Sequence, residues 1–153
     1  MRILIAVCVF MGMCAMCEGC RCSKPLTNKS FGCRSDFIIK TEVLSDMMAL
    51  VPKDPSNMYY KIRTPSHIYK FKGSKSGINF ERVYTAENSA MCGVTLDKGY
   101  TYILSGTIDT TKKRLTLNSC VSWTEKSSIS LQSRVLLTLF EEKKVNCSQF
   151  AGP

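Results

Sequence analysis

The number of cysteines in the mature chain limits the possible folds most strongly, and it depends on where that chain begins. The 153-residue sequence has nine cysteines. Arg2 precedes an uninterrupted apolar run, Ile3 to Met16, and Cys17 and Gly19 then place small residues at the −3 and −1 positions of a cleavage site. This pattern is typical of a secretory signal peptide. We therefore predict that residues 1–19 are removed and that residues 20–153 form a single secreted domain.

A transmembrane anchor is the alternative interpretation of the apolar run. A membrane-spanning helix needs about 20 apolar residues, and Glu18 ends this run before that length is reached. No other segment is long and apolar enough, so we expect no membrane span.

Loss of the leader removes Cys8, Cys14 and Cys17 and leaves six cysteines. Six cysteines in a small exported chain normally form three disulfides. A zinc site made of side chains is disfavoured because the chain has a single histidine, His67, and no paired CxxC motifs. A thioredoxin-type redox motif is also absent, since only Arg21 separates Cys20 from Cys22. The six expected disulfide cysteines are Cys20, Cys22, Cys33, Cys92, Cys120 and Cys147.

The formal net charge of +9 survives cleavage, because one basic residue and one acidic residue are lost together. Such a surface attracts sulfated glycosaminoglycans or acidic partners, although a solvated basic face kept for solubility is the favoured explanation. We expect no nucleic-acid binding, because the chain is exported and has no recognition motif. The densest basic cluster contains Lys61, Arg63, Lys70, Lys72 and Lys75.

Most of the mature sequence has the composition of short β-strands separated by turns. This pattern indicates a closed or nearly closed β-barrel. The predicted strands are Asp36–Ser45, Met58–Arg63, His67–Lys72, Ile78–Thr85, Tyr100–Asp109 and Lys113–Cys120.

One segment has helical periodicity instead. From Ser128 onward, apolar residues recur at helical spacing, namely Leu131, Val135, Leu139 and either Ile129 or Leu136. We predict that this stripe packs on the barrel, with Ser127 or Ser128 as the N-cap.

The residues that enzymes use are mostly missing. No nucleophile-elbow, zinc-protease or phosphate-binding motif occurs. His67 lies in strand-like sequence, and Glu141 and Glu142 lie near a predicted helix end. A disulfide-bonded cysteine cannot act as a thiolate nucleophile. We therefore expect a protein that is not an enzyme and has no cofactor of its own.

Cleavage after Gly19 would create one reactive group, the α-amine of Cys20. An α-amine has an ordinary pKa of about 7.7–8.0, so it is partly neutral near pH 7. Its nitrogen and the Cys20 carbonyl oxygen could chelate a metal ion, such as a protease zinc with an open position. The plainer alternative is that Cys20 only fastens the end of the chain.

At this point the sequence resembles a known family, the tissue inhibitors of metalloproteinases. The resemblance spans Cys20 to Cys147 and begins with CxC at the predicted mature N-terminus. It continues through "FGCRSDFIIKTEV", "SAMCGVTLD", "YILSGTI" and "LTLNSCVSWTEKSSISLQSR", and it closes with "VNC".

The resemblance implies the netrin-like inhibitory domain of that family. This is an OB-fold-like five-stranded β-barrel with flanking helices. The family also pairs its cysteines in one way, which here implies the disulfides Cys20–Cys92, Cys22–Cys120 and Cys33–Cys147.

The same resemblance implies which residues would meet a target enzyme. The Cys20 amine and carbonyl would bind the catalytic zinc of the target, and Arg21 would enter its main specificity pocket. The expected inhibitory ridge is Cys20, Arg21, Cys22, Ser23, Lys24, Pro25, Ser89, Ala90 and Met91.

Two features depart from the family pattern. Members usually have threonine or serine where this chain has Arg21, and burying an unpaired cation in an apolar pocket is costly. The sequence also stops six residues after Cys147, before the family's second domain, which resembles single-domain inhibitors of invertebrates such as nematodes. Two sequons, at Asn28 and Asn146, are possible N-glycosylation sites.

We therefore expect a secreted, monomeric inhibitor of matrix or disintegrin-type zinc metalloproteinases. The alternative is a non-inhibitory netrin-like module that binds a receptor or a matrix component.

Overall fold

The structure is a computed structural model that describes Cys20, Cys22 and residues 27–150. The predicted signal peptide, residues 1–19, lies outside these residues, so its cleavage stays a prediction. Among the described helices, none combines the length and the apolar character needed to cross a membrane.

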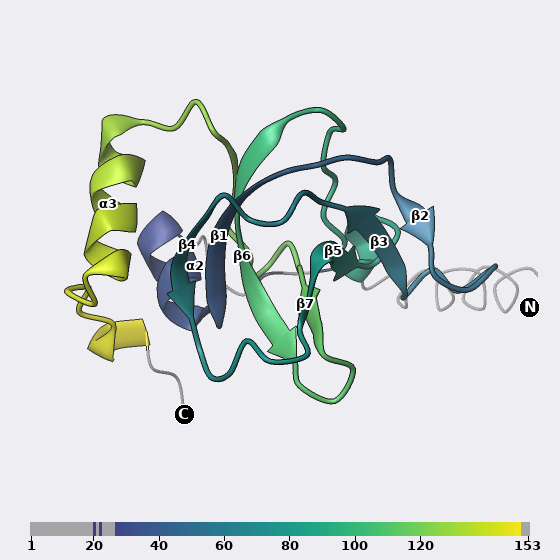
Figure 1. Ribbon diagram of the computed structural model, residues 1–153, viewed down its shortest axis with the longest axis horizontal. Coiled ribbons are helices and arrows are strands. Elements are labelled where there is room, and N and C mark those ends of the chain that lie inside the picture. The colour runs from purple at the N-terminus through teal and green to yellow at the C-terminus, as the bar shows by residue number, and fades with distance from the viewer. Residues whose placement is uncertain (1–19, 21, 23–26, 151–153) are drawn as a thin grey trace, which may run out of the picture.

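The described residues form a β-rich molecule with two α-helices beside the sheet (Figure 1). The strands are β1 (Phe37–Glu42), β2 (Met48–Ala49), β3 (Met58–Lys61), β4 (His67–Phe71), β5 (Asn79–Thr85), β6 (Thr101–Asp109), β7 (Arg114–Thr116) and β8 (Thr124–Lys126). The helical elements are α2 (Asn28–Arg34), η2 (Ser89–Met91), α3 (Leu131–Glu141) and η3 (Ser148–Phe150).

All six strands expected from the sequence are present, although the first and the last are clearly shorter than predicted. The eight strands form one sheet in the order β2-β3-β5-β7-β6-β1-β4, and β8 pairs with β6. The β5–β7 pair is parallel and the other named pairs are antiparallel. The mainly β prediction is therefore confirmed, and β2 and β8 are additions that the sequence pattern did not indicate.

The strand order describes an open path and not a closed ring. Beyond the named strands, an isolated bridge pairs Val43 with Ile62. Leu44 N also donates to Lys61 O at 2.8 Å, and Arg63 N donates to Glu42 O at 2.9 Å. These bonds connect the end of β1 to the end of β3, but the five-stranded closed barrel stays a prediction.

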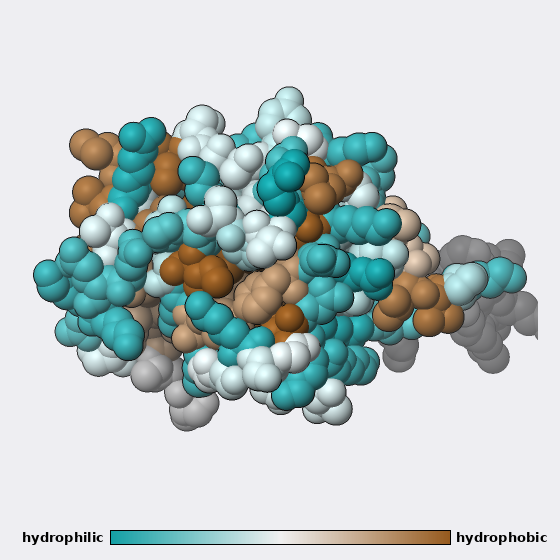
Figure 2. Space-filling view, in the orientation of Figure 1, coloured by the Kyte–Doolittle hydropathy of each residue, from teal (hydrophilic) through white to brown (hydrophobic). Residues whose placement is uncertain are grey.

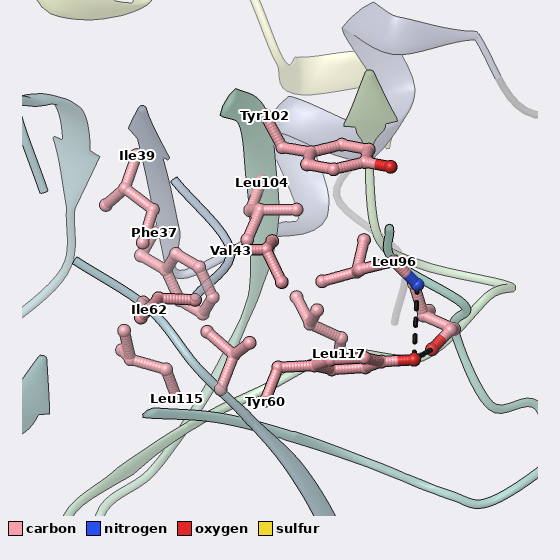
Figure 3. Packing of buried hydrophobic residues seen from close by; sticks show 12 residues of the cluster. Phe37, Ile39, Val43, Tyr60, Ile62, Leu96, Tyr102, Leu104, Leu115 and Leu117 are labelled. Carbon is pink, nitrogen blue, oxygen red and sulfur yellow. Dashed lines mark hydrogen bonds between the residues drawn. The ribbon is translucent and has the colours of Figure 1, made fainter. Parts of the chain in front are cut away.

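Strand β1 is buried on both faces because it runs between β4 and β6 with side chains packed above and below. Phe37 and Ile39 join the larger core inside the curved sheet, while Ile38 points to a second core under the helices. All three side chains are fully buried. Figure 3 shows the larger core, in which the Tyr60 hydroxyl also donates to Val94 O at 3.3 Å. Burying each such side chain contributes about 1.5–3 kcal/mol.

Helix α3 begins later than expected and buries a different face. Ser130 is its N-cap and accepts a hydrogen bond from Ser133 N at 3.1 Å, so the prediction of Ser127 or Ser128 was wrong. The residues buried on the helix are Ser133, Leu137 and Phe140.

The predicted apolar stripe of α3 was also wrong in part. Leu131 is 78% exposed and Val135 is 53% exposed, and apolar surface is visible over the upper part of α3 in Figure 2. The segment has more apolar residues than one helix face can hold. Leu137 and Phe140 take the packing positions against Ile38 and Trp123.

Helix α2 was not predicted, although its first turn has a recognisable signal. The Thr27 hydroxyl accepts from Ser30 N at 3.2 Å, and the Ser30 hydroxyl accepts from Thr27 N at 2.9 Å. This reciprocal pair is a capping box. Phe140 of α3 packs directly against Gly32, where an added Cβ would lie 2.4 Å from the ring. A glycine therefore allows the two helices to approach closely.

Candidate functional site

Two disulfides meet at one edge of the sheet and hold the start of the described chain. Cys20 is bonded to Cys92 and Cys22 to Cys120, with Cα–Cα distances of 5.0 and 5.2 Å. The Sγ atoms of Cys20 and Cys120 lie 3.2 Å apart, so the two disulfides pack against each other. The third disulfide, Cys33–Cys147, joins α2 to the segment after α3. These are the three pairs that the family resemblance implied.

Each of these two disulfides closes a long loop and so stabilises the fold. Cys20–Cys92 and Cys22–Cys120 have sequence separations of 72 and 98 residues. Closing each loop is worth about 4–5 kcal/mol in the chain-entropy model, and the loops overlap, so the two values do not add. Three sulfur atoms, those of Cys20, Cys92 and Cys120, lie within 4.8 Å of one another. Because all three are in disulfides, they offer no thiolate to a metal ion.

The backbone nitrogen of Cys20 has a specific hydrogen-bond partner. It donates to Ala90 O at 2.8 Å, which is a short and favourable distance for such a bond. The residue that is predicted to begin the mature chain is thus attached twice to the same loop. Its sulfur is bonded to Cys92 and its nitrogen is bonded to the carbonyl of Ala90.

That loop consists of η2 and the residues around it. Asn88 is the N-cap of η2, and its side-chain oxygen accepts from Met91 N at 3.2 Å. Ser89, Ala90 and Met91 are all exposed, and Met91 is 41% exposed despite its apolar side chain. The loop therefore presents an apolar side chain to solvent next to Cys20.

The chain can leave η2 only through a sharp turn. Cys92 adopts a left-handed conformation with φ of 60°. Gly93 N then donates to Asn88 O at 2.8 Å. A Cβ on Gly93 would lie 2.3 Å from Ala86 O and 2.7 Å from Asn88 O. Only glycine fits there without moving the loop.

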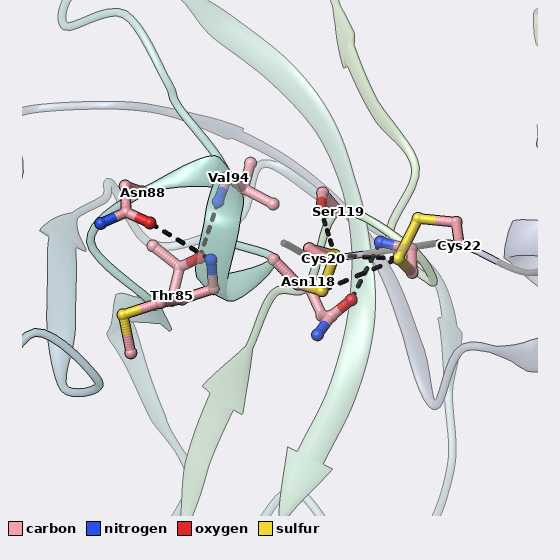
Figure 4. Close-up of a disulfide and its surroundings, with 10 residues drawn as sticks. Cys20, Cys22, Thr85, Asn88, Val94, Asn118 and Ser119 are labelled. Carbon is pink, nitrogen blue, oxygen red and sulfur yellow. Dashed lines mark hydrogen bonds between the residues drawn. A yellow bond between two sulfur atoms is a disulfide. The ribbon is translucent and has the colours of Figure 1, made fainter. Parts of the chain in front are cut away.

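A second segment supports the disulfide pair from the other side (Figure 4). Ser119 N donates to Cys92 O at 2.9 Å. The Asn118 side-chain oxygen accepts from Cys120 N at 2.9 Å, and Asn118 N donates to the Ser122 hydroxyl at 3.0 Å. The backbone on both sides of the sulfur atoms is therefore fixed by hydrogen bonds.

The structure brings together five of the nine residues expected in the ridge: Cys20, Cys22, Ser89, Ala90 and Met91. The other four, Arg21, Ser23, Lys24 and Pro25, lie outside the described residues, and their roles stay predictions. Sequence reasoning missed the supporting residues Asn88, Gly93, Asn118 and Ser119. Asn88 carried a signal, since an asparagine that precedes a short helical turn is a favoured N-cap.

The predicted basic cluster is partly neutralised by nearby groups. Arg63 pairs with Glu42 at 2.9 Å, and Lys72 lies 3.7 Å from Asp36. Lys70 Nζ donates to Gly32 O and Cys33 O at 2.8 and 3.1 Å. Burial lowers the pKa of Lys70, against a smaller opposing effect of Asp36. Glycosaminoglycan binding by this cluster stays a prediction.

The single histidine has a surface partner far along the chain. His67 Nε2 lies 2.9 Å from Glu141 Oε1, and the ring of His67 packs 4.4 Å from that of Tyr69. This contact connects β4 to the end of α3, as expected for a structural histidine.

Comparison with known proteins gives a consistent result. The family model described as tissue inhibitor of metalloproteinase matches residues 18–151. The chain is 25% identical over 146 residues to a tissue inhibitor of metalloproteinase from Drosophila melanogaster, covering 95% of this chain and 64% of the fly protein. It is 31% identical over 94 residues to metalloproteinase inhibitor 4 of Mus musculus, covering 60% of this chain and 42% of the mouse protein.

A human relative gives a similar match. The chain is 31% identical over 96 residues to metalloproteinase inhibitor 2 of Homo sapiens, covering 58% of this chain and 41% of the human protein. The chain therefore spans less than two thirds of the length of each of these relatives.

Proposed function

Because the chain belongs to the tissue inhibitor of metalloproteinase family, we propose that it inhibits a zinc metalloproteinase through the amine and carbonyl of Cys20. Members of this family are inhibitors of zinc metalloproteinases and not enzymes. The proposal for this chain adds a mechanism and names the residues that carry it.

The observation that carries the proposal is the double attachment of Cys20 beside an exposed loop. Its nitrogen bonds to Ala90 O at 2.8 Å and its sulfur to Cys92. A free amine at this position keeps a hydrogen for Ala90 O while its lone pair remains available to a metal ion. A bidentate ligand that is already oriented loses little further freedom when it binds.

To inhibit such an enzyme, this chain needs only to occupy the open coordination position of the catalytic zinc. A catalytic zinc in a protease has three protein ligands and a fourth position held by water. Occupying that position removes the water needed for hydrolysis. Ser89, Ala90 and Met91 would contact the enzyme beside the zinc, and Arg21, Cys22, Ser23, Lys24 and Pro25 would follow the substrate cleft.

The proposal requires further properties of the chain. Cleavage after Gly19 must expose the Cys20 amine, so the protein must be exported and residues 20–153 must form the inhibitory domain. We also propose that the sheet closes as an OB-fold-like barrel, which the Val43–Ile62 bridge supports.

The proposal is tested by measuring inhibition with an altered N-terminus. The mature protein, beginning at Cys20, is titrated against a panel of matrix and disintegrin-type metalloproteinases. A matched variant has one alanine added before Cys20, which converts the amine into an amide. We expect the mature protein to inhibit at least one enzyme and the extended variant to lose that inhibition.

Two results would count against the mechanism. Equal inhibition by the extended variant would exclude chelation through the amine. No inhibition across the panel would favour the alternative, a netrin-like module that binds a receptor or matrix component.

A further inference from the structure

The two N-glycosylation sequons differ in which side-chain atom of the asparagine makes hydrogen bonds within the protein. An N-linked sugar is attached to the side-chain nitrogen, Nδ2. Asn28 begins the sequon Asn28-Lys29-Ser30, and Asn146 begins the sequon Asn146-Cys147-Ser148. In the folded protein, Nδ2 of Asn28 donates hydrogen bonds, whereas at Asn146 the side-chain oxygen makes the hydrogen bonds.

At Asn28 the nitrogen is part of the helix packing. Nδ2 donates to Glu125 Oε2 at 3.2 Å and to Ser133 Oγ at 3.3 Å. The same Glu125 oxygen also accepts from Trp123 Nε1 at 2.8 Å. Asn28 therefore connects α2 to α3 and to the carboxylate below them, and it is only half exposed. A sugar on Nδ2 would replace one of its two hydrogens and break one of these bonds.

The serine of the first sequon, Ser30, is also buried and hydrogen-bonded. Ser30 is 3% exposed, and its hydroxyl belongs to the capping box with Thr27. An enzyme that reads the serine hydroxyl of the sequon cannot reach it once α2 has formed.

At Asn146 the fold uses the oxygen and not the nitrogen. Asn146 Oδ1 accepts from Ser148 N at 3.0 Å and from Ser148 Oγ at 2.7 Å. Both residues are exposed, and Asn146 lies between α3 and η3, outside regular secondary structure. A sugar on Nδ2 leaves both hydrogen bonds in place.

We propose that Asn146 is the N-glycan acceptor of the secreted chain and that Asn28 is an unmodified structural amide. The proposal rests on the export that the proposed function requires, but not on inhibition. In Figure 1, α3 and β2 lie on opposite sides of the molecule.

The test is secretion of the full chain from a eukaryotic cell line, followed by intact mass measurement before and after enzymatic release of N-glycans. We expect one glycan on the parent protein and on Asn28→Gln. We expect none on Asn146→Gln or on Ser148→Ala, which removes the sequon but keeps the asparagine. Because all these residues except Asn28 are exposed, the Asn146 and Ser148 variants should still fold, and a thermal melt checks this.

Three outcomes would overturn the proposal. These are a glycopeptide containing Asn28, a glycan that persists in Ser148→Ala, and a secreted parent protein without any glycan. Both proposals require export, but inhibition does not enter these mass measurements, so a failure of the inhibition proposal leaves their outcomes unchanged.

Discussion

Replacing Gly93 with alanine should weaken inhibition, because it moves the loop that holds the Cys20 nitrogen. The new Cβ would lie 2.3 Å from Ala86 O, whereas such contacts are essentially never closer than 3.0 Å. The loop must therefore shift by about 0.7 Å or more. The clash involves backbone atoms, so no side-chain rotation can relieve it.

The size of the effect follows from the hydrogen bond between Cys20 and Ala90. A shift of this size carried to Ala90 O lengthens the 2.8 Å bond to about 3.5 Å, beyond the usual range. One lost hydrogen bond costs about 0.5–1.5 kcal/mol. Each 1.4 kcal/mol is a factor of ten, so we expect the inhibition constant to rise about two- to tenfold.

The assay pairs inhibition titration with a thermal melt of the same preparation. Gly93→Ala should also lower the free energy of unfolding by about 1–3 kcal/mol through overpacking. Gly99→Ala is the matched control. Gly99 has φ of 84°, which costs about 1–2 kcal/mol for an alanine, but an added Cβ meets no atom within 4 Å. The control should lose stability and keep its inhibition constant. Undiminished inhibition by folded Gly93→Ala would refute the role of the loop.

Three further predictions test other parts of the account. Arg21→Thr should strengthen inhibition of enzymes with apolar specificity pockets, because it removes the cost of burying a cation. Weaker inhibition in the titration would contradict this and would mean that the arginine has an acidic partner in the enzyme. Gly32→Ala places a Cβ 2.4 Å from the Phe140 ring and should lower the free energy of unfolding in a denaturant titration by about 1–3 kcal/mol; an unchanged midpoint would contradict the packing of α2 on α3. The hydrogen bond and charge of Lys126 lower the pKa of Asp97. This pair therefore stabilises the fold at pH values above the ordinary aspartate pKa, and the stabilisation is lost as the pH falls through the lowered pKa. Asp97→Asn should therefore reduce the acid dependence of the melting temperature, and an identical pH profile would refute the pairing.

The β-strands could be predicted from the sequence because their apolar side chains are the ones that the fold buries. Phe37, Ile38 and Ile39 are apolar in succession, and this first half of β1 is buried on both faces. The helix α3 was harder, because Leu131, Val135, Leu137 and Phe140 give more apolar positions than one face can bury. Only the tertiary packing against Ile38 and Trp123 selects Leu137 and Phe140.

The candidate site was predictable in part. The CxC motif and a family resemblance indicated Cys20 and the loop from Ser89 to Met91. The hydrogen bond from Cys20 N to Ala90 O could not be predicted, because it joins residues that are distant in sequence and depends on how the loop turns at Gly93. The different use of the Asn28 and Asn146 nitrogens also depends on tertiary contacts, since both residues satisfy the same sequence motif.

The most direct test of the central claim is the visible absorption spectrum of a cobalt-substituted target protease. Cobalt in the zinc position reports changes in its own ligands. Binding of the mature protein, beginning at Cys20, should change the spectrum, because an amine nitrogen and a carbonyl oxygen replace the bound water. A protein that inhibits the enzyme at saturation and leaves the cobalt spectrum unchanged would contradict chelation by Cys20.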